Sequence, residues 1–127
     1  MAARKVIVTI APTSNFQGKE ANPALPINAK EVATAVRECW DAGASIAHMH
    51  ARDAAGIPTN EAAVFREMNA AVRAECDIII QNSIAPANRP EPRTAKDGLA
   101  ALDAFPEMAS LDMGIATVTM NNREQHI

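Results

Sequence analysis

The sequence predicts a single α/β domain in which strands and helices alternate along the chain. Three short apolar runs, at residues 5–10, 44–51 and 77–82, have the length and composition of strands. Between them, apolar residues recur at the three- and four-residue spacing of amphipathic helices. Units of this kind form parallel sheets, either in an open doubly wound fold or in a (β/α)₈ barrel. A complete barrel needs about 250 residues, so the 127 residues would supply about half of one.

The first strand is predicted over Lys5–Ile10, where the sequence is almost continuously β-branched. Such a run is typical of a strand that a parallel sheet buries on both faces. The following stretch, residues 11–27, contains Pro12, Pro23 and Pro26, which exclude a long helix. Connections of this length are usually functional or disordered in a compact domain. Residues 11–27 are called the first loop below.

A helix is predicted to begin at Asn28, whose side chain can accept a hydrogen bond from the backbone N–H of Glu31. Glu31 can reach back to the cap residue, which completes a capping box. Gly43 is expected to end this helix, because glycine adopts the left-handed conformation at little cost. The apolar stripe of the helix comprises Val32, Val36, Cys39 and Trp40.

The strand–helix pattern then repeats. Residues Ala44–Ala51 form the second predicted strand, and Thr59 or Asn60 is expected to cap the helix that follows it. The apolar stripe of this helix comprises Val64, Phe65, Met68 and Val72. Asp77–Asn82 is predicted as the third strand, because three isoleucines follow one another within it.

The last predicted unit starts at Thr94, which can form a capping box with Asp97. The apolar stripe of its helix comprises Leu99, Leu102 and Phe105. A fourth strand is predicted over Met108–Met113, ending at Gly114. The count is four parallel strands alternating with three helices, in one domain over residues 1–127.

Composition excludes several classes of function. The formal charge is −3, with 12 basic and 15 acidic residues mixed along the chain, so no basic field for nucleic acid exists. Aromatic residues make up 3% of the chain and leave no platform for stacking bases. No apolar run approaches the ~20 residues that cross a bilayer, and the N-terminus lacks a signal-peptide pattern. Cys39 and Cys76 are interpreted as buried thiols in a reducing cytosol rather than as a disulfide, which predicts a cytoplasmic protein.

His48 and His50 are the most informative residues of the sequence. Side chains alternate across a strand, so histidines two positions apart project from the same face. Both imidazoles could then bind one metal ion, each through one nitrogen. They also stand at the end of a predicted strand, where α/β folds place their active sites. The competing interpretation is a pair of ordinary histidines on a barely exposed strand.

Other candidate residues follow the predicted strands. Catalytic zinc usually has three protein ligands, but spacing places no third one, since His126 lies in a polar terminal segment. Ser83 and Ser110 could hold a carboxylate or carbonyl oxygen of a substrate, or serve as ordinary loop serines. Arg52 could bind a substrate anion, or it could pair with Asp53 and its loop. Glycine-rich phosphate-binding motifs are absent from the sequence.

Five segments of the chain carry a family resemblance through their residues and their order. They are Lys5-Val-Ile-Val-Thr with Pro12-Thr13, Leu25-Pro26, residues 42–53 with His-Met-His-Ala-Arg-Asp, Ile78-Ile-Ile-Gln-Asn-Ser, and Pro106-Glu-Met-Ala-Ser-Leu-Asp-Met-Gly. Together they run over nearly the whole chain in the correct order, and the His-x-His-x-Arg-Asp and Pro-Glu-Met-Ala-Ser-Leu-Asp-Met-Gly segments are specific. The sequence resembles the β-keto acid cleavage enzyme family, which includes 3-keto-5-aminohexanoate cleavage enzymes.

The resemblance implies a (β/α)₈ TIM barrel of which this chain covers about the N-terminal half, with a divalent metal, usually zinc, at the C-terminal face. It implies an acyltransferase-type reaction, in which a β-keto acid condenses with acetyl-CoA and is cleaved to acetoacetate and a new CoA thioester. His48 and His50 would be two of three metal ligands. Ser83, Ser110 and Asp112 would line the keto-acid pocket. Relatives assemble as tetramers, so a homo-oligomer is expected.

The sequence departs from the family pattern in three places. Relatives that act on an amino-bearing keto acid carry an acidic residue in the first loop, where this chain has Phe16. A substrate without that amine is therefore expected. Pro86 replaces a glycine that usually follows the third strand, which removes a backbone N–H. The family's late glutamate ligand and an arginine that stabilises intermediates are absent, so the isolated chain is expected to be inactive or nearly so.

Other interpretations of the same residues were weighed. A non-catalytic half-barrel would bind metal or associate with itself through its open sheet edge. Cupins and amidohydrolase barrels also pair histidines on a strand. Cupins contain few helices, and amidohydrolases carry the pair on their first strand, whereas here it falls on the second. Both therefore fit poorly.

Overall fold

The computed structural model describes residues 4–91, 94–111, 117–120 and 123–126, and for the last two segments it describes the backbone only. Its centre is a four-stranded, fully parallel sheet in the order β1-β2-β5-β6. The strands are β1 (Thr9–Ile10), β2 (Ile46–Met49), β5 (Ile79–Asn82) and β6 (Met108–Ala109). Two antiparallel pairs accompany the sheet, β3 (Ala51–Arg52) with β4 (Pro58–Thr59) and β7 (Thr117–Met120) with β8 (Arg123–His126). The predicted parallel α/β architecture is confirmed.

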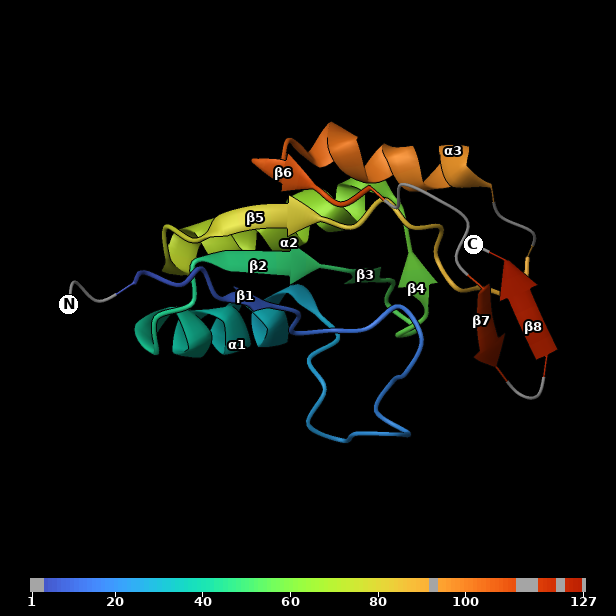
Figure 1. The fold of residues 1–127 in the computed structure, drawn as a ribbon, viewed down its shortest axis with the longest axis horizontal. Coiled ribbons are helices and arrows are strands. Elements are labelled where there is room, and N and C mark those ends of the chain that lie inside the picture. Colours follow the sequence, from blue (N-terminus) through green and yellow to red (C-terminus); the bar gives the residue numbers. More distant parts are fainter. Residues whose placement is uncertain (1–3, 92–93, 112–116, 121–122, 127) are drawn as a thin grey trace.

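The helices of the described residues pack on one face of this sheet (Figure 1). They are α1 (Ala29–Asp41), α2 (Ala62–Glu75) and α3 (Ala95–Gly98), which continues as the 3₁₀ helix η1 (Leu99–Ala104). The core forms where their apolar side chains meet the sheet, and its fully buried members include Val32, Val36, Ala47, Met49, Phe65, Val72, Ile80 and Ala101. Burial of this apolar surface holds the helices on the sheet.

The opposite face of the sheet has no helix over it among the described residues. In β2, Met49 is fully buried on the helix side, while the neighbouring His48 is only half-buried. In β5, Ile80 is fully buried and Ile79 is 41% exposed. This alternation means that every second side chain of each strand points to the face without helices, which we call the uncovered face.

The first strand is much shorter than predicted, and the expectation that it is buried on both faces is wrong. Only Thr9 and Ile10 pair with β2, and the valines and isoleucine before them, Val6, Ile7 and Val8, are 46% to 78% exposed. The reason is the position of β1 at the edge of the described sheet, with one face uncovered. A β-branched run signals burial only when neighbours exist on both sides.

The boundaries of α1 follow the sequence closely. Asn28 Oδ1 accepts a hydrogen bond from Glu31 N at 2.9 Å, as predicted for a cap. Glu31 reaches back to the backbone N–H of Ile27, at 2.9 Å, one residue before the cap. Gly43 follows the helix with a φ of +103°, which glycine adopts without strain. The predicted start and end of this helix are confirmed.

The predicted cap of α2 is wrong. The cap residue is Glu61, and it makes no side-chain hydrogen bond to the helix. Asn60 instead donates from Nδ2 to the carbonyl of Ala85 at 3.0 Å and accepts at Oδ1 from the N–H of Ala87 at 2.6 Å. Its amide is therefore occupied by the loop after β5. The predicted stripe is confirmed, since Phe65, Met68 and Val72 are buried.

The third helix begins as predicted but buries a different face. Thr94 and Asp97 form the capping box, with Thr94 N 2.6 Å from Asp97 Oδ2. The predicted stripe is wrong, because Leu99, Leu102 and Phe105 are 47%, 40% and 81% exposed. The chain tightens here to a 3₁₀ helix, in which residues three apart lie on one face. The buried face consists of Gly98, Ala101 and Ala104.

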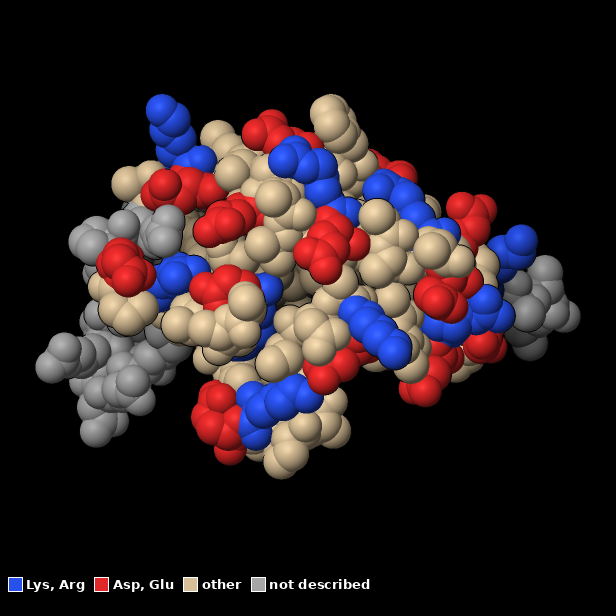
Figure 2. Space-filling model, turned by 180° about the vertical axis from the view of Figure 1, so that it is seen from behind, with Lys and Arg blue, Asp and Glu red and all other residues tan. Residues whose placement is uncertain are grey.

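The molecular surface carries both signs of charge. Figure 2 shows Lys and Arg interspersed with Asp and Glu on the face it displays, without a large patch of either sign. Among the described helices, none has both the length and the apolar composition that crossing a bilayer requires. The end of the predicted fourth strand, at residues 112–114, lies outside the described residues.

Candidate functional site

The candidate site lies where the parallel strands end. Strands β2 and β5 point toward the end of the molecule where the first loop, the β3–β4 turn and the loop after β5 gather (Figure 1). His50 directly follows β2, Ser83 follows β5, and Ser110 follows β6. Because parallel strands end at a common edge, the structure brings these sequence-predicted residues to one end of the sheet. Asp112 lies outside the described residues.

His48 and His50 project from the uncovered face. Their ring centroids are 4.9 Å apart, and the ring planes meet at 82°, an edge-to-face arrangement. Met49 between them is fully buried on the helix side. The prediction that both rings share one face is confirmed, and it follows from the two-residue period of the strand.

The spacing of the two rings fits one metal ion. With metal–nitrogen distances of ~2.0–2.1 Å and tetrahedral angles, two ligating imidazoles have centroids roughly 5 Å apart, and the observed separation is 4.9 Å. Within the part of the chain that the structure describes, no group of three or more His, Cys, Asp and Glu side chains is placed to hold a metal. The structure thus places two imidazoles close together, one fewer than the three protein ligands that catalytic zinc usually has.

Gln81 is a neighbour of His48 that the sequence interpretation missed. The register of β2 and β5 places these residues opposite each other. Gln81 Oε1 lies 2.8 Å from His48 Nδ1, a hydrogen-bond distance. The feature of the sequence that could have pointed to Gln81 was its position as a polar residue after a run of isoleucines. Recognising its partner required the register between two strands, which a single sequence does not contain.

His50 is held in its neutral form. Burial, with smaller contributions from the nearby His48 and Arg52, lowers the pKa of His50 from 6.5 to about 4. Burial acts this way because a low-dielectric surrounding disfavours the charged imidazolium. A neutral ring keeps a nitrogen lone pair at pH 7, which is the form that binds metals.

Arg52 holds the first loop rather than projecting into solvent. It is 7% exposed. Its Nη1 donates to the carbonyl of Gly56 at 2.7 Å, and its Nη2 donates to Ser14 O at 2.7 Å and to Gln17 O. Of the alternatives open from the sequence, the structure shows contact with the following loop through Gly56. Asp53 itself pairs with Arg89 at 3.0 Å.

Two buried asparagines hold other loops at the same end of the sheet. Asn15 of the first loop donates from Nδ2 to Pro86 O and accepts at Oδ1 from the N–H of Asn88, each at 3.0 Å. Asn60 makes the comparable pair of bonds to the same loop. We call Asn15, Arg52 and Asn60 the loop clamps. Apart from the contact of Arg52 with its own loop at Gly56, these clamping contacts were not predicted, because the partners lie 25 to 73 residues away.

The two serines differ in their surroundings. Ser83 is 3% exposed, its N–H donates to Met49 O at 2.9 Å, and its Oγ accepts from the N–H of Ala85 at 3.4 Å. This is the loop-serine role that the sequence left open. Ser110 is half-buried, and its N–H donates to Asn82 O at 3.1 Å. Substrate contact by either hydroxyl stays a prediction.

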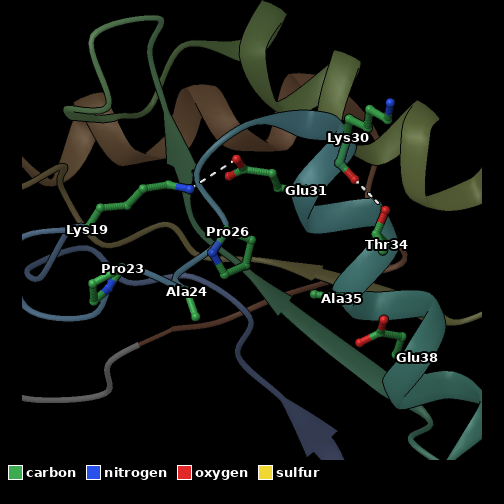
Figure 3. Close-up of a pocket in the computed structure, with 9 residues that line it drawn as sticks. All are labelled: Lys19, Pro23, Ala24, Pro26, Lys30, Glu31, Thr34, Ala35 and Glu38. Atoms are coloured by element: carbon green, nitrogen blue, oxygen red, sulfur yellow. Dashed lines mark hydrogen bonds and ion pairs between the residues drawn. The ribbon is translucent and has the colours of Figure 1, made fainter.

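A hollow of about 370 Å³ lies away from the histidines, between the first loop and α1 (Figure 3). Lys19 from the loop reaches across to Glu31 of the helix, with Nζ 3.0 Å from Oε1. Because Lys19 and Glu31 form an ion pair with each other, we interpret the hollow as a junction between loop and helix and not as an active site. The histidine pair remains the candidate site.

Comparison with known proteins places these residues in a family context. The family described as beta-keto acid cleavage enzyme matches residues 5–127. The chain is 38% identical over 112 residues to a 3,5-dioxohexanoate:acetyl-CoA acetone transferase of Paraburkholderia graminis and 39% identical over 111 residues to a 3-keto-5-aminohexanoate cleavage enzyme of Fusobacterium nucleatum. It is 29% identical over 108 residues to a 3-oxoadipate:acetyl-CoA acetyltransferase of Cupriavidus necator. These matches cover 85% to 87% of this chain and 36% to 40% of the relatives, so the chain spans less than half their length.

Proposed function

Because the chain belongs to the β-keto acid cleavage enzyme family, we propose that it contributes the first part of an acyltransferase-type enzyme acting on a β-keto acid and acetyl-CoA. The reaction joins the two substrates and then cleaves the product to acetoacetate and a new CoA thioester. Two of the relatives named above carry acetyl-CoA in their names. The third is named for the cleavage of a keto compound.

The observation that carries this proposal is the histidine pair at the carboxyl end of a parallel strand. Both rings share the uncovered face, 4.9 Å apart. That end of the sheet is also where the clamped loops gather, so a small ligand would meet fixed groups there. Two histidines with only a structural role would not have to lie at the carboxyl end of a strand beside these loops.

His48 and His50 would hold a divalent cation, with zinc as the first candidate. A bound cation would polarise the ketone oxygen of the keto acid and stabilise the enolate that attacks the thioester. The residues fit this role because His50 is neutral at pH 7 and because the ring spacing matches two ligands of one ion.

Ser83, Ser110, Asp112 and Arg52 are proposed to bind the keto acid. Ser83 and Ser110 are supported by their position after adjacent strands of one sheet. Arg52 supplies a guanidinium beside His50, and its Nε has no hydrogen-bond partner among the described residues. The proposed substrate lacks an amine, because Phe16, half-exposed on the first loop, cannot pair with an ammonium group.

A (β/α)₈ barrel is the proposed architecture of the complete domain. Helices on one face of a four-stranded parallel sheet are half of the arrangement that such a barrel requires, and this is what the described residues show. For this chain by itself a homo-oligomer is proposed, because the described sheet has open edges at β1 and β6, which the remaining strands of a complete barrel would pair. A cytoplasmic location is supported by the free thiols of Cys39 and Cys76, although both residues are half-buried and not buried as predicted.

The proposed function is tested by measuring the formation of acetoacetate. The purified protein is incubated with Zn²⁺, acetyl-CoA and a panel of β-keto acids, alone and together with the remaining C-terminal part of the Fusobacterium nucleatum relative. We expect little turnover from the chain alone and acetoacetate in the mixture, abolished by His48→Ala. Equal acetoacetate from the His48→Ala mixture would contradict the role of the pair. Preference for an amine-bearing keto acid would contradict the interpretation of Phe16.

A non-catalytic, metal-binding or self-associating half-barrel is the second candidate. The open edges of the described sheet favour it, because unpaired strand edges invite association. It predicts uptake of one metal per histidine pair, or concentration-dependent oligomers, without acetoacetate in any mixture. Zinc stoichiometry and sedimentation measured beside the acetoacetate assay separate the two functions.

A further inference from the structure

The side chain of Gln81 lies within hydrogen-bond distance of one ring nitrogen of His48. Gln81 Oε1 lies 2.8 Å from His48 Nδ1. An amide oxygen has no proton to donate, so the hydrogen bond takes its proton from Nδ1. A neutral imidazole carries only one N–H, and Nε2 is left with a lone pair. The contact therefore selects one of two tautomers.

The geometry around this contact is rigid. β2 and β5 are paired in register at His48 and Gln81, and the backbone N–H of Ile80 also donates to Glu107 Oε2 at 3.0 Å. The edge-to-face contact with His50 restricts the His48 ring from its other side. Among the described residues, no other side chain hydrogen-bonds to His48. The tautomer thus depends on this one amide.

We propose that Gln81 is a positioning residue, which fixes His48 in the Nδ1–H tautomer and so presents Nε2 to a divalent cation. The cation in this statement rests on the proposed function, whereas the tautomer is a property of the metal-free protein. Ligating histidines commonly donate their second ring N–H to an oxygen acceptor, and removal of that acceptor costs about 10–100-fold in metal affinity.

The test compares three variants with the unaltered protein. Gln81→Leu removes the acceptor, Gln81→Glu keeps an acceptor of similar size, and Ile79→Val changes the same face of the same strand without touching the hydrogen bond. Protein labelled with ¹⁵N-histidine, freed of metal with a chelator, reports the tautomer of each ring in long-range ¹⁵N–¹H spectra at pH 8. The 127 residues contain only three histidines, so the ring signals are assigned by single substitutions. Zinc affinity is then measured by competition with a chromophoric chelator.

We expect the Nδ1–H tautomer at His48 in the unaltered protein, in Ile79→Val and in Gln81→Glu, and its loss in Gln81→Leu. Zinc affinity should fall about 10–100-fold in Gln81→Leu and stay within a few-fold of the unaltered value in the other two. An Nε2–H tautomer in the unaltered protein, or an unchanged tautomer in Gln81→Leu, overturns the inference. Equal losses of affinity in both Gln81 variants with the tautomer unchanged also overturn it, because they indicate a structural role alone.

The two readouts separate this inference from the proposed function. If the unaltered protein binds no zinc but shows a Gln81-dependent Nδ1–H tautomer, the positioning role of Gln81 stands and the metal assignment fails. If zinc binds through His48 and the tautomer ignores Gln81, the metal assignment stands and this inference fails.

Discussion

Replacement of Gly98 by alanine tests a close approach between the backbone at Gly98 and the loop after β5. A Cβ built on Gly98 lies 1.8 Å from the carbonyl oxygen of Ile84 and 2.8 Å from its carbonyl carbon. These are backbone atoms, so they cannot turn aside as a flexible side chain would. To reach an ordinary van der Waals distance, the junction of α3 and η1 at Gly98 and the loop after β5 must separate by roughly 1.5 Å. The loop that would move begins directly after Ser83.

The expected cost is larger than the gain from helix propensity. Alanine is favoured over glycine within a helix by roughly 0.5–1 kcal/mol. Forcing an extra methyl group into a packed interior costs typically 1–3 kcal/mol. Separation of the two segments also strains the bond from Asn82 Nδ2 to Ala101 O, which is 2.9 Å long. An overpacking cost near the upper end of that range, less the gain from helix propensity, gives an expected net loss of about 2 kcal/mol.

Chemical unfolding in urea, monitored by far-ultraviolet circular dichroism, measures this loss. Gly18→Ala is the matched control, because its Cβ would meet only the tip of the Glu20 side chain, at 2.4 Å or more. That carboxylate can swing away, so the free energy of unfolding should change by about 1 kcal/mol or less. Neither glycine has a positive φ. Equal stability of Gly98→Ala and Gly18→Ala would refute the close approach of these two backbones.

Three further predictions concern the clamp, the histidine and the 3₁₀ helix. Arg52→Lys should destabilise the protein by about 2 kcal/mol and speed proteolysis within the first loop, because one ammonium group cannot replace the hydrogen bonds from the guanidinium to three carbonyls. The control is Arg66→Lys at an exposed position. Equal rates of proteolysis in the two variants would contradict the clamping role of Arg52. The pKa of His50 falls to about 4 on folding, below its unfolded 6.5, so the unfolded chain takes up the proton first as pH drops. In metal-free protein, stability should therefore be complete above about pH 6.5 and decline toward pH 4 by up to about 3 kcal/mol, and urea unfolding of His50→Asn should show a shallower decline. Leu102→Gln should change the free energy of unfolding by no more than about 0.5 kcal/mol, while Ala104→Leu should lower it by about 1–3 kcal/mol. Thermal melts measure both variants. A larger loss in Leu102→Gln than in Ala104→Leu would mean that the face predicted from the sequence is the buried one.

The parts of the fold that depend on near neighbours could be predicted from the sequence. Asn28 caps α1 and Gly43 follows its end because their partners lie within a few residues. The predicted cap at Asn60 failed because its amide bonds to residues more than twenty positions away. The predicted stripe at Leu102 failed because the exposed set Leu99, Leu102 and Phe105 and the buried set Gly98, Ala101 and Ala104 have the same three-residue spacing, so periodicity alone does not decide which face packs against the core.

The candidate site divides in the same way. The common face of His48 and His50 follows from the two-residue period of any strand, so it needed no tertiary information. Gln81 is different, because a shift of one residue between β2 and β5 would turn its side chain to the helix side. The role of Arg52 likewise depends on where the first loop folds, which its prolines leave open.

The buried polar residues explain why the loops around the histidines adopt a single arrangement. Nearly all of them lie at or beyond the carboxyl ends of the strands: Thr13, Asn15, Arg52, Thr59, Asn60, Asn82 and Ser83. Burying an unpaired amide costs about 1–3 kcal/mol, so each loop clamp is stable only when its particular backbone partners are in place. An apolar side chain at this position would be compatible with many loop conformations. The amide of Asn15, in contrast, makes both of its hydrogen bonds only when Pro86 and Asn88 lie next to it. The clamps therefore couple the first loop to the loop after β5, and displacing one loop should loosen the other beside His48 and His50.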